Sequence, residues 1–223
     1  MTYSRIKTGV FHARPNRFIA LVEVEGEEVV CHVKNTGRCK ELLVPGCTVV
    51  LEVADNPHRK TPYDVIAVYK GERLINMDSQ APNQVAEEYL QQRFPEAHLR
   101  REVRYGDSRL DFRMEQNGES WLIEVKGCTL EVDNVGYFPD APTDRGVKHL
   151  QHLTKAVQEG YRAAVLFIIQ MEGVAAIRPN DGTHPAFGEA LRGAKKAGVE
   201  VWAVDCRVTP DTLSHRNAVP VEL

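Results

Sequence analysis

The stretches RLDFR at residues 109–113 and WLIEVKG at residues 121–127 carry the pattern that decides the fold. Each is typical of a β-strand, and period-two alternation places Glu124 and Lys126 on one face, with the apolar residues between and beside them on the other. If the two strands form a hairpin, Asp111 meets Glu124 near the end of the sheet. The pattern therefore predicts two carboxylates and one ammonium group at a single sheet edge.

Two carboxylates in this position suit a hard cation. Asp111 and Glu124 can bind Mg²⁺ (or Mn²⁺) in octahedral oxygen coordination, completed by the Val125 carbonyl and water. The cation would polarise a phosphodiester, while Lys126 would position or deprotonate an attacking water or neutralise the transition state. A bare Glu-x-Lys is usually a solvated pair of charges, but the flanking apolar runs and the preceding Asp favour the functional interpretation.

The elements after Pro82 predict an α/β domain over residues 81–223, with a central mixed sheet flanked by helices. Helical spacing indicates helices over residues 83–93, 147–159 and 187–197. Strands are expected over residues 102–105, 109–114, 121–125, 163–170 and 199–205. The strand–helix–strand–helix–strand order in the second half implies parallel pairing there.

Residues 1–80 predict a separate small β-barrel. Short strands are expected over residues 18–25, 28–33, 48–54, 64–69 and 74–77, with turns between them and no long helix. Five strands suit an OB-like barrel that binds nucleic acid, and strand pattern alone leaves a generic small barrel as an equal alternative.

Several further residues are candidates for the site. Glu87 and Glu88 lie on the first expected helix, and Glu87 lies nearer its apolar stripe. Gln170 ends a buried strand and Asp140 lies in the loop 136–143, so both are candidates for the edge of the site. Gln170 has a simple alternative as a satisfied glutamine at a strand end.

Two basic groups are candidates for DNA phosphate contacts. One lies on the helix that starts near residue 145, where cations are disfavoured by the helix dipole and therefore suggest an anionic partner. The other lies in the barrel, where OB-type proteins combine cations with stacking aromatics such as Phe18. The candidates are Arg145, Lys148, His149, His152, Arg14, Arg17, Lys34 and Arg38.

Composition limits the class of protein. The 223 residues carry a net charge of −3, which argues against indiscriminate coating of nucleic acid but leaves room for a local basic groove. The five cysteines are odd in number and lack a CxxC pair, as expected for reduced thiols. No long apolar run or secretory signal is present, so we expect a cytoplasmic protein without membrane contact.

Six segments together resemble one family over nearly the whole chain. They are residues 14–18 (RPNRF), 32–39 (HVKNTGRC), 78–83 (DSQAPN), 123–130 (IEVKGCTL), 136–143 (GYFPDAPT) and 145–150 (RGVKHL). The chain resembles the sugar fermentation stimulation protein A family. Asp111 with Glu124 and Lys126 is similar to the PD-(D/E)XK nuclease signature, here without the Pro before the Asp. Nucleases of this type often add a glutamate from the first helix, so the resemblance implies a third metal-binding carboxylate at Glu87 rather than Glu88, with a solvated helix glutamate as an equal alternative.

The resemblance implies an OB-like N-terminal domain, a nuclease-like C-terminal domain and DNA binding linked to the regulation of sugar utilisation genes. Two functions remain open, a Mg²⁺-dependent endo- or exonuclease and a non-enzymatic DNA-binding regulator. The sequence contains no helix-turn-helix pattern, which counts against a regulator that reads the major groove. A third alternative is a barrel that binds oligosaccharide, but no residue pattern requires it. The sequence leaves the oligomeric state open, a homodimer included.

Overall fold

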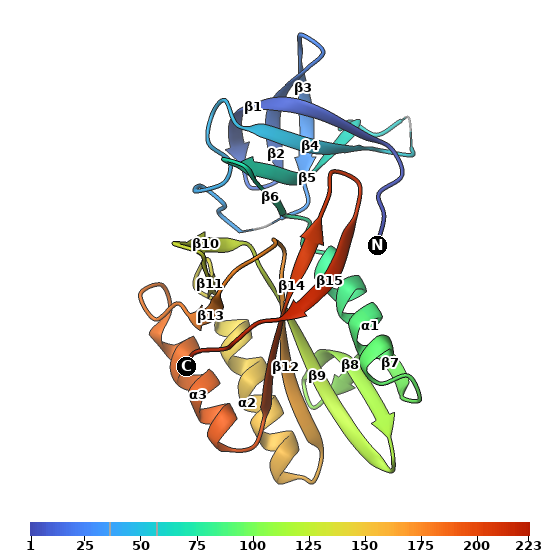
Figure 1. The fold of residues 1–223 in the computed structure, drawn as a ribbon, viewed down its shortest axis with the longest axis vertical. Helices are drawn as coiled ribbons and strands as arrows, with labels where there is room; N and C mark the ends of the chain where they lie inside the picture. Colours follow the sequence, from blue (N-terminus) through green and yellow to red (C-terminus); the bar gives the residue numbers. More distant parts are fainter. Residues whose placement is uncertain (36, 57) are drawn as a thin grey trace.

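The computed structural model describes residues 1–35, 37–56 and 58–223, so Thr36 and Pro57 lie outside the described residues. The chain forms a β-barrel stacked on an α/β domain (Figure 1). The barrel strands are β1 (Ile6–Asn16), β2 (Ile19–Val24), β3 (Glu27–Val33), β4 (Thr48–Val53), β5 (Tyr63–Lys70) and β6 (Arg73–Asn76). The helices are α1 (Ala81–Arg93), α2 (Asp144–Gln158) and α3 (Pro185–Lys196). The remaining strands are β7 (His98–Tyr105), β8 (Ser108–Gln116), β9 (Glu119–Cys128), β10 (Leu130–Val132), β11 (Val135–Phe138), β12 (Arg162–Ile169), β13 (Ala176–Pro179), β14 (Glu200–Val208) and β15 (Leu213–Ala218).

The barrel closes because β3 pairs with β5 as well as with its hairpin partner β2. The order β3-β2-β1-β4-β5 returns to β3, and β6 continues from β5 as a hairpin. Glu25 and Gly26 join β2 to β3 with φ values of 57° and 87°, the backbone that a two-residue hairpin turn requires. The strands predicted between residues 18 and 77 are confirmed.

The strand β1 was not predicted, because Gly9 and Pro15 interrupt its pattern. Gly9 is needed where β1 crosses β2: a Cβ atom there would lie 2.5 Å from the Val22 side chain and 2.7 Å from the Glu23 carbonyl oxygen. Close approach of two backbones is a common reason for glycine inside a strand. The residue that weakens the sequence signal is therefore the one that allows the barrel to close.

The α/β domain is built on the sheet β15-β14-β12-β9-β8-β7, in which β9, β12 and β14 are parallel. Leu90 of α1 packs with Ile123 in one buried cluster, and Leu153 of α2 and Phe187 of α3 pack with Val165 in another. The helices therefore cover opposite faces of the sheet, and the predicted mixed sheet with its parallel section is confirmed. No helix in the described part of the chain is long and apolar enough to cross a membrane.

Four short strands were missed. β10, β11 and β13 form a separate three-stranded sheet, and β15 pairs antiparallel with β14. The first half of the loop expected over residues 136–143 is thus strand β11, which pairs in parallel with β13. Such strands are too short to show period-two alternation, and their pairing depends on segments far away in the sequence.

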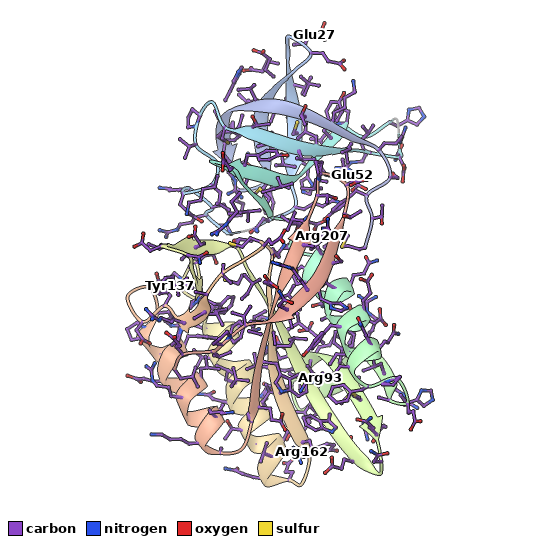
Figure 2. All side chains as sticks on the ribbon, viewed as in Figure 1. Glu27, Glu52, Arg93, Tyr137, Arg162 and Arg207 are labelled. Carbon is purple, nitrogen blue, oxygen red and sulfur yellow. The ribbon has the colours of Figure 1, made fainter. Side chains whose placement is uncertain are left out.

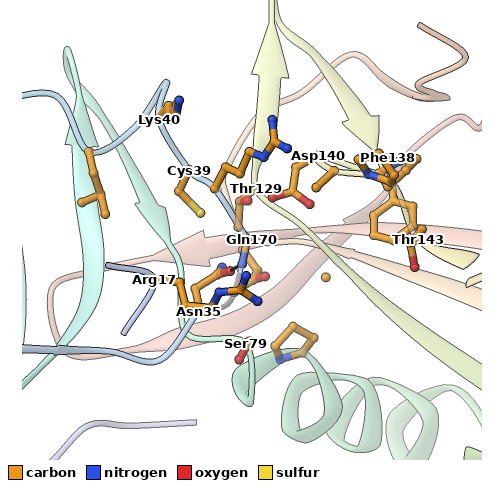
Figure 3. A pocket seen from close by; sticks show the side chains of 18 of the residues that line it. Arg17, Asn35, Cys39, Lys40, Ser79, Thr129, Phe138, Asp140, Thr143 and Gln170 are labelled. Atoms are coloured by element: carbon orange, nitrogen blue, oxygen red, sulfur yellow. Dashed lines mark hydrogen bonds between the residues drawn. The ribbon is translucent and has the colours of Figure 1, made fainter. Parts of the chain in front are cut away.

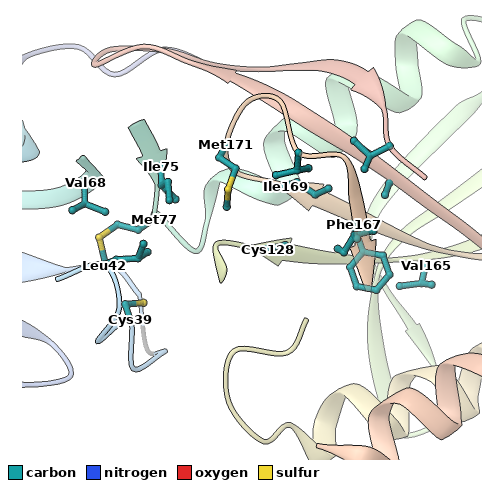
Figure 4. Close-up of a cluster of buried hydrophobic side chains, with 14 of the residues drawn as sticks. Cys39, Leu42, Val68, Ile75, Met77, Cys128, Val165, Phe167, Ile169 and Met171 are labelled. Atoms are coloured by element: carbon teal, nitrogen blue, oxygen red, sulfur yellow. The ribbon is translucent and has the colours of Figure 1, made fainter. Parts of the chain in front are cut away.

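The two parts of the molecule share one hydrophobic cluster. Figure 4 shows Leu42 and Met77 from the barrel side in line with Met171 and Ile169 from the α/β domain, and all four belong to the same buried cluster. Figure 2 shows the extent of the molecule, from Glu27 at the tip of the barrel to Arg162, the first residue of β12, at the opposite end of the α/β domain. The shared cluster fixes the barrel against the edge of the sheet where the carboxylates lie.

Candidate functional site

Asp111 of β8 and Glu124 of β9 lie where the β8–β9 ladder ends. Glu124 is 3% exposed, and its Oε1 accepts hydrogen bonds from Lys126 Nζ (2.6 Å) and from His149 Nδ1 on α2. Asp111 Oδ2 accepts from the backbone N–H of Val125 (2.7 Å). The structure thus brings together the three residues of the predicted edge and adds His149 to them.

Helix α1 contributes Asn83 to this cluster. Asn83 Nδ2 donates to Asp111 Oδ1 (2.9 Å), close to the helix start that Pro82 favours. Glu87, the predicted third carboxylate, lies one turn further along, and its Oε2 is 3.5 Å from Arg101 Nη1. The signal for Asn83 was present in the sequence, since residues four apart on a helix share a face, but an amide was not considered.

The pKa values of the two carboxyl groups are shifted in opposite directions. Burial raises the pKa of Asp111, and the charge of Glu124 raises it further. Burial also opposes the ionisation of Glu124, but the hydrogen bond from His149 and the ammonium of Lys126 outweigh it and lower the pKa of Glu124. A cation shared between the two groups would relieve the repulsion that disfavours charge on Asp111.

One atom of the cluster has unused capacity for a metal. Glu124 Oε2 is buried and has no hydrogen-bond partner among the described residues. Such an orphan is costly in a protein interior, and a carboxylate oxygen is the ligand that Mg²⁺ prefers. The described ranges contain no group of three or more His, Cys, Asp or Glu side chains placed to hold a metal ion. Asp111 and Glu124 would therefore need water or substrate oxygens to complete a coordination shell.

A cleft of about 890 Å³ lies between the barrel and the α/β domain, directly beside the cluster (Figure 3). Asn83 and Val125, which both donate to Asp111, line its wall. Gln170 and Asp140, the two predicted edge residues, line it as well. The cleft therefore lies next to the carboxylates through Asn83 and Val125, although Asp111, Glu124 and Lys126 are not among its lining residues.

Three exposed cations belong to the barrel wall of this cleft. Arg17 and Arg38, both predicted, line it together with Lys40. Within residues 1–35, 37–56 and 58–223, none of the three forms an ion pair, so their charges are available to an anion. Phosphate groups of a nucleic acid backbone are the anions that such an arrangement of cations suits.

Two other predicted barrel cations are engaged inside the protein. The Arg14 guanidinium donates to four backbone carbonyls at 2.6–2.9 Å, those of Arg17, Asn35, Gly37 and Arg38. It therefore holds together the two loops that carry the cleft cations. Lys34 does not line the cleft; its Nζ lies 3.0 Å from Glu52 Oε2 and 3.6 Å from carboxylate oxygens of both Asp64 and Asp78.

The basic residues predicted on α2 have different surroundings in the structure. Lys148 Nζ and His152 Nε2 both contact the carboxylate of Asp107, at 2.8 Å and 3.2 Å. Arg145 is exposed, and its Nε donates to His149 Nε2 (3.4 Å). His149 itself is 4% exposed, so it serves Glu124 rather than the exposed face of the helix. Nothing in the sequence pattern indicated that Asp107, which lies in the turn between β7 and β8, would contact α2.

Gln170 is fixed by its neighbours. Its Nε2 donates to Asn76 Oδ1 (2.9 Å) and to the Asp78 carbonyl (3.0 Å), which orients Oε1 toward Gly127 at the cleft. Asp140 approaches Gly37 of the barrel so closely that a Cβ atom there would meet its Oδ2. Both residues lie at the boundary between the domains.

The protein is of a two-domain class, in which a closed barrel is joined to a mixed-sheet α/β domain. A buried carboxylate cluster lies beside the cleft between the two domains. The family described as "SfsA N-terminal OB domain" matches residues 13–77, and "Sugar fermentation stimulation protein RE domain" matches residues 80–212. The chain belongs to the sugar fermentation stimulation family, which confirms both the predicted resemblance and the OB barrel.

Full-length relatives agree with this assignment. A sugar fermentation stimulation protein homolog of Desulfitobacterium hafniense (strain DSM 10664 / DCB-2) is 52% identical, covering 100% of this chain and 99% of the relative. A homolog of Clostridium beijerinckii is 50% identical, with 100% of both chains covered. The solved structure of Pyrococcus furiosus SfsA in complex with Ca²⁺ is similar with a TM-score of 0.89 and 26% identity, covering 100% of this chain and 98% of that chain.

Proposed function

We propose that the chain binds DNA in the cleft between its two domains and hydrolyses phosphodiester bonds with Mg²⁺ or Mn²⁺ held by Asp111 and Glu124. One observation carries the proposal: the wall that holds the unpaired cations faces the residues that hydrogen-bond Asp111. The relative from Pyrococcus furiosus was solved with Ca²⁺, which supports cation binding by this fold.

The roles of the chain's own residues follow from their contacts. Arg17, Arg38 and Lys40 would bind the phosphate backbone and bring a phosphodiester to the α/β wall. Lys126, already donating to Glu124, would orient a water or stabilise developing negative charge. When bound, the cation would supply Lewis-acid polarisation of the phosphodiester.

The test compares cleavage by the wild-type chain and by Asp111→Asn, on labelled duplex, single-stranded and branched DNA with Mg²⁺ or Mn²⁺. Asp133→Asn is the control, since Asp133 is an exposed turn residue whose positive φ of 50° asparagine tolerates. We expect Asp111→Asn alone to lose cleavage and to weaken Mg²⁺ binding in calorimetry. Unchanged Mg²⁺ affinity in Asp111→Asn would contradict the metal assignment.

A second function, a DNA-binding regulator without catalysis, is favoured by one contact. Lys126 Nζ and His149 Nδ1 both donate to Glu124 Oε1, an arrangement that stabilises the buried charge without a metal ion. Such a protein would bind all the DNA substrates without cleaving them. Lys126→Ala separates the functions, because a regulator should keep its DNA affinity while a nuclease should lose its rate.

A further inference from the structure

An exposed aromatic ring lies next to the cations of the cleft. Phe18 is 50% exposed, and it alone is exposed among the Phe, Tyr and Trp side chains in the described ranges. Phe18 itself does not line the cleft, but Asn16 and Arg17, the two residues before it in the chain, both do. Leaving a large apolar ring in water costs free energy, and an isolated aromatic beside a basic groove is typical of a surface that contacts bases.

The turn that carries Phe18 is held in place. Its backbone N–H donates to Asn16 Oδ1 (2.9 Å), and its carbonyl accepts from the Val33 N–H (2.8 Å). The next carbonyl back along the chain, that of Arg17, accepts from Arg14 (2.7 Å). The ring is therefore presented by an ordered backbone, which lowers the entropy cost of binding.

The size of the cleft favours one strand over two. Its volume of about 890 Å³ is in the range of small-molecule pockets, roughly 300–1,000 Å³. The walls also meet at one point, since there is no room for a Cβ atom between Gly37 of the barrel and Asp140 of the α/β domain. A double helix is too bulky to enter a space of this size, whereas a single strand with exposed bases can enter it.

We propose that the ligand of this cleft is a single nucleic acid strand with unpaired bases, one of which stacks on Phe18 while Arg17, Arg38 and Lys40 hold its phosphates. The inference rests on the proposed function of the cleft and names the substrate class. Stacking on an aromatic side chain requires an unpaired base, because in a duplex both faces of each base are covered.

The experiment measures binding by fluorescence anisotropy, in EDTA so that no strand is cut. The probes are labelled oligothymidylate, oligouridylate and a hairpin duplex with the same number of nucleotides. We expect at least one single strand to bind more tightly than the duplex, and the tighter of the two identifies DNA or RNA as the source. Phe18→Ala should weaken single-strand binding by roughly 5- to 150-fold, the equivalent of one stacked base.

Two variants control the measurement. Phe18→Trp should retain binding, and its emission should be quenched by the strand. Val30→Ala removes a side chain that is similarly exposed (45%) but lies within the β2–β3 ladder opposite Leu21, away from the turn that carries Phe18, and should change nothing. Equal affinity for duplex and strands, or equal effects of Phe18→Ala and Val30→Ala, would overturn the inference while Arg38→Glu still tests the cleft. If no probe binds, the proposed function fails as well.

Discussion

Glu124 shows how single contacts define the site. One of its oxygens accepts two hydrogen bonds and the other is buried without a partner in the described part of the chain. An ionised carboxylate is stable in such a place only if its partners are close, and His149 from α2 is one of them. The sequence placed His149 on the helix but counted it among the candidates for DNA contact, because the β9–α2 connection that brings it to Glu124 is a tertiary feature.

His149→Leu should destabilise the fold by about 2 kcal/mol, the contribution of a hydrogen bond to a charged group. The buried Glu124 would then depend on Lys126 alone. His152→Leu is the matched control, one turn along the same helix, because His152 pairs with the largely exposed Asp107 and such pairs contribute less than about 1 kcal/mol. Urea unfolding at neutral pH measures both losses.

The histidine prediction depends on the difference between the two variants. A similar loss of stability for His149→Leu and His152→Leu would show that the contact with Glu124 adds nothing beyond ordinary packing of α2. A loss for His149→Leu that disappears in a Glu124→Gln background would instead locate the interaction in this pair.

At the scale of elements, the sequence was informative where a segment is long or regularly patterned. Helices α1, α2 and α3 and strands β8, β9, β12 and β14 have clear periodicity, and their parallel order followed from the alternation of strand and helix. β1, β10, β11, β13 and β15 were missed because glycines, bulges or short length hide their pattern. Their formation depends on pairing with segments distant in the sequence, which no local window contains.

The residues of the candidate site could likewise be predicted only in part from the sequence. Asp111, Glu124 and Lys126 lie on two consecutive strands, so hairpin register alone predicted their meeting. Asn83 shares a helix face with Glu87 and was overlooked because only carboxylates were considered, whereas the cleft could not be predicted, because it depends on how the barrel docks on the sheet. Packing between elements, rather than residue type, decides which polar groups line the cleft.

Gly127 tests how tightly β9 is pressed against α1. A Cβ atom at this position would lie 2.6 Å from Gln170 Oε1 and 2.6 Å from Pro82 Cγ, and the proline ring cannot move away. Gly127→Ala should therefore destabilise the protein by about 1–3 kcal/mol, as overpacking does. Gly193→Ala, in α3 with open space around it, should stabilise by about 0.5–1 kcal/mol. Thermal unfolding measures both changes, and a neutral Gly127→Ala would contradict the close packing.

For the whole molecule, the barrel and the α/β domain are joined by a buried polar link as well as by the shared hydrophobic cluster. Gln170 of the α/β domain donates to Asn76 Oδ1 and to the Asp78 carbonyl, and Asn76 Nδ2 donates to Tyr3 Oη (2.9 Å). Lys34 Nζ lies 3.6 Å from Asp78 Oδ2. Such a network ties the position of the barrel wall to the position of the sheet edge, so the shape of the cleft depends on it.

Gln170→Glu removes the donor of this link while keeping its shape. The new oxygen would face the Asn76 and Asp78 oxygens without a proton to share, so we expect a loss of about 1–3 kcal/mol or more. Gln151→Glu on the exposed face of α2 is the control and should cost almost nothing.

Both tryptophans, Trp121 and Trp202, lie in the α/β domain, so their fluorescence follows that domain while hydrogen exchange in β4 and β5 follows the barrel. In the wild-type chain the two readouts should report one cooperative transition, whereas in Gln170→Glu the barrel should exchange at lower denaturant than the tryptophans respond. Coincident transitions in the variant would mean that the hydrophobic cluster alone couples the domains and that Gln170 acts only within the cleft.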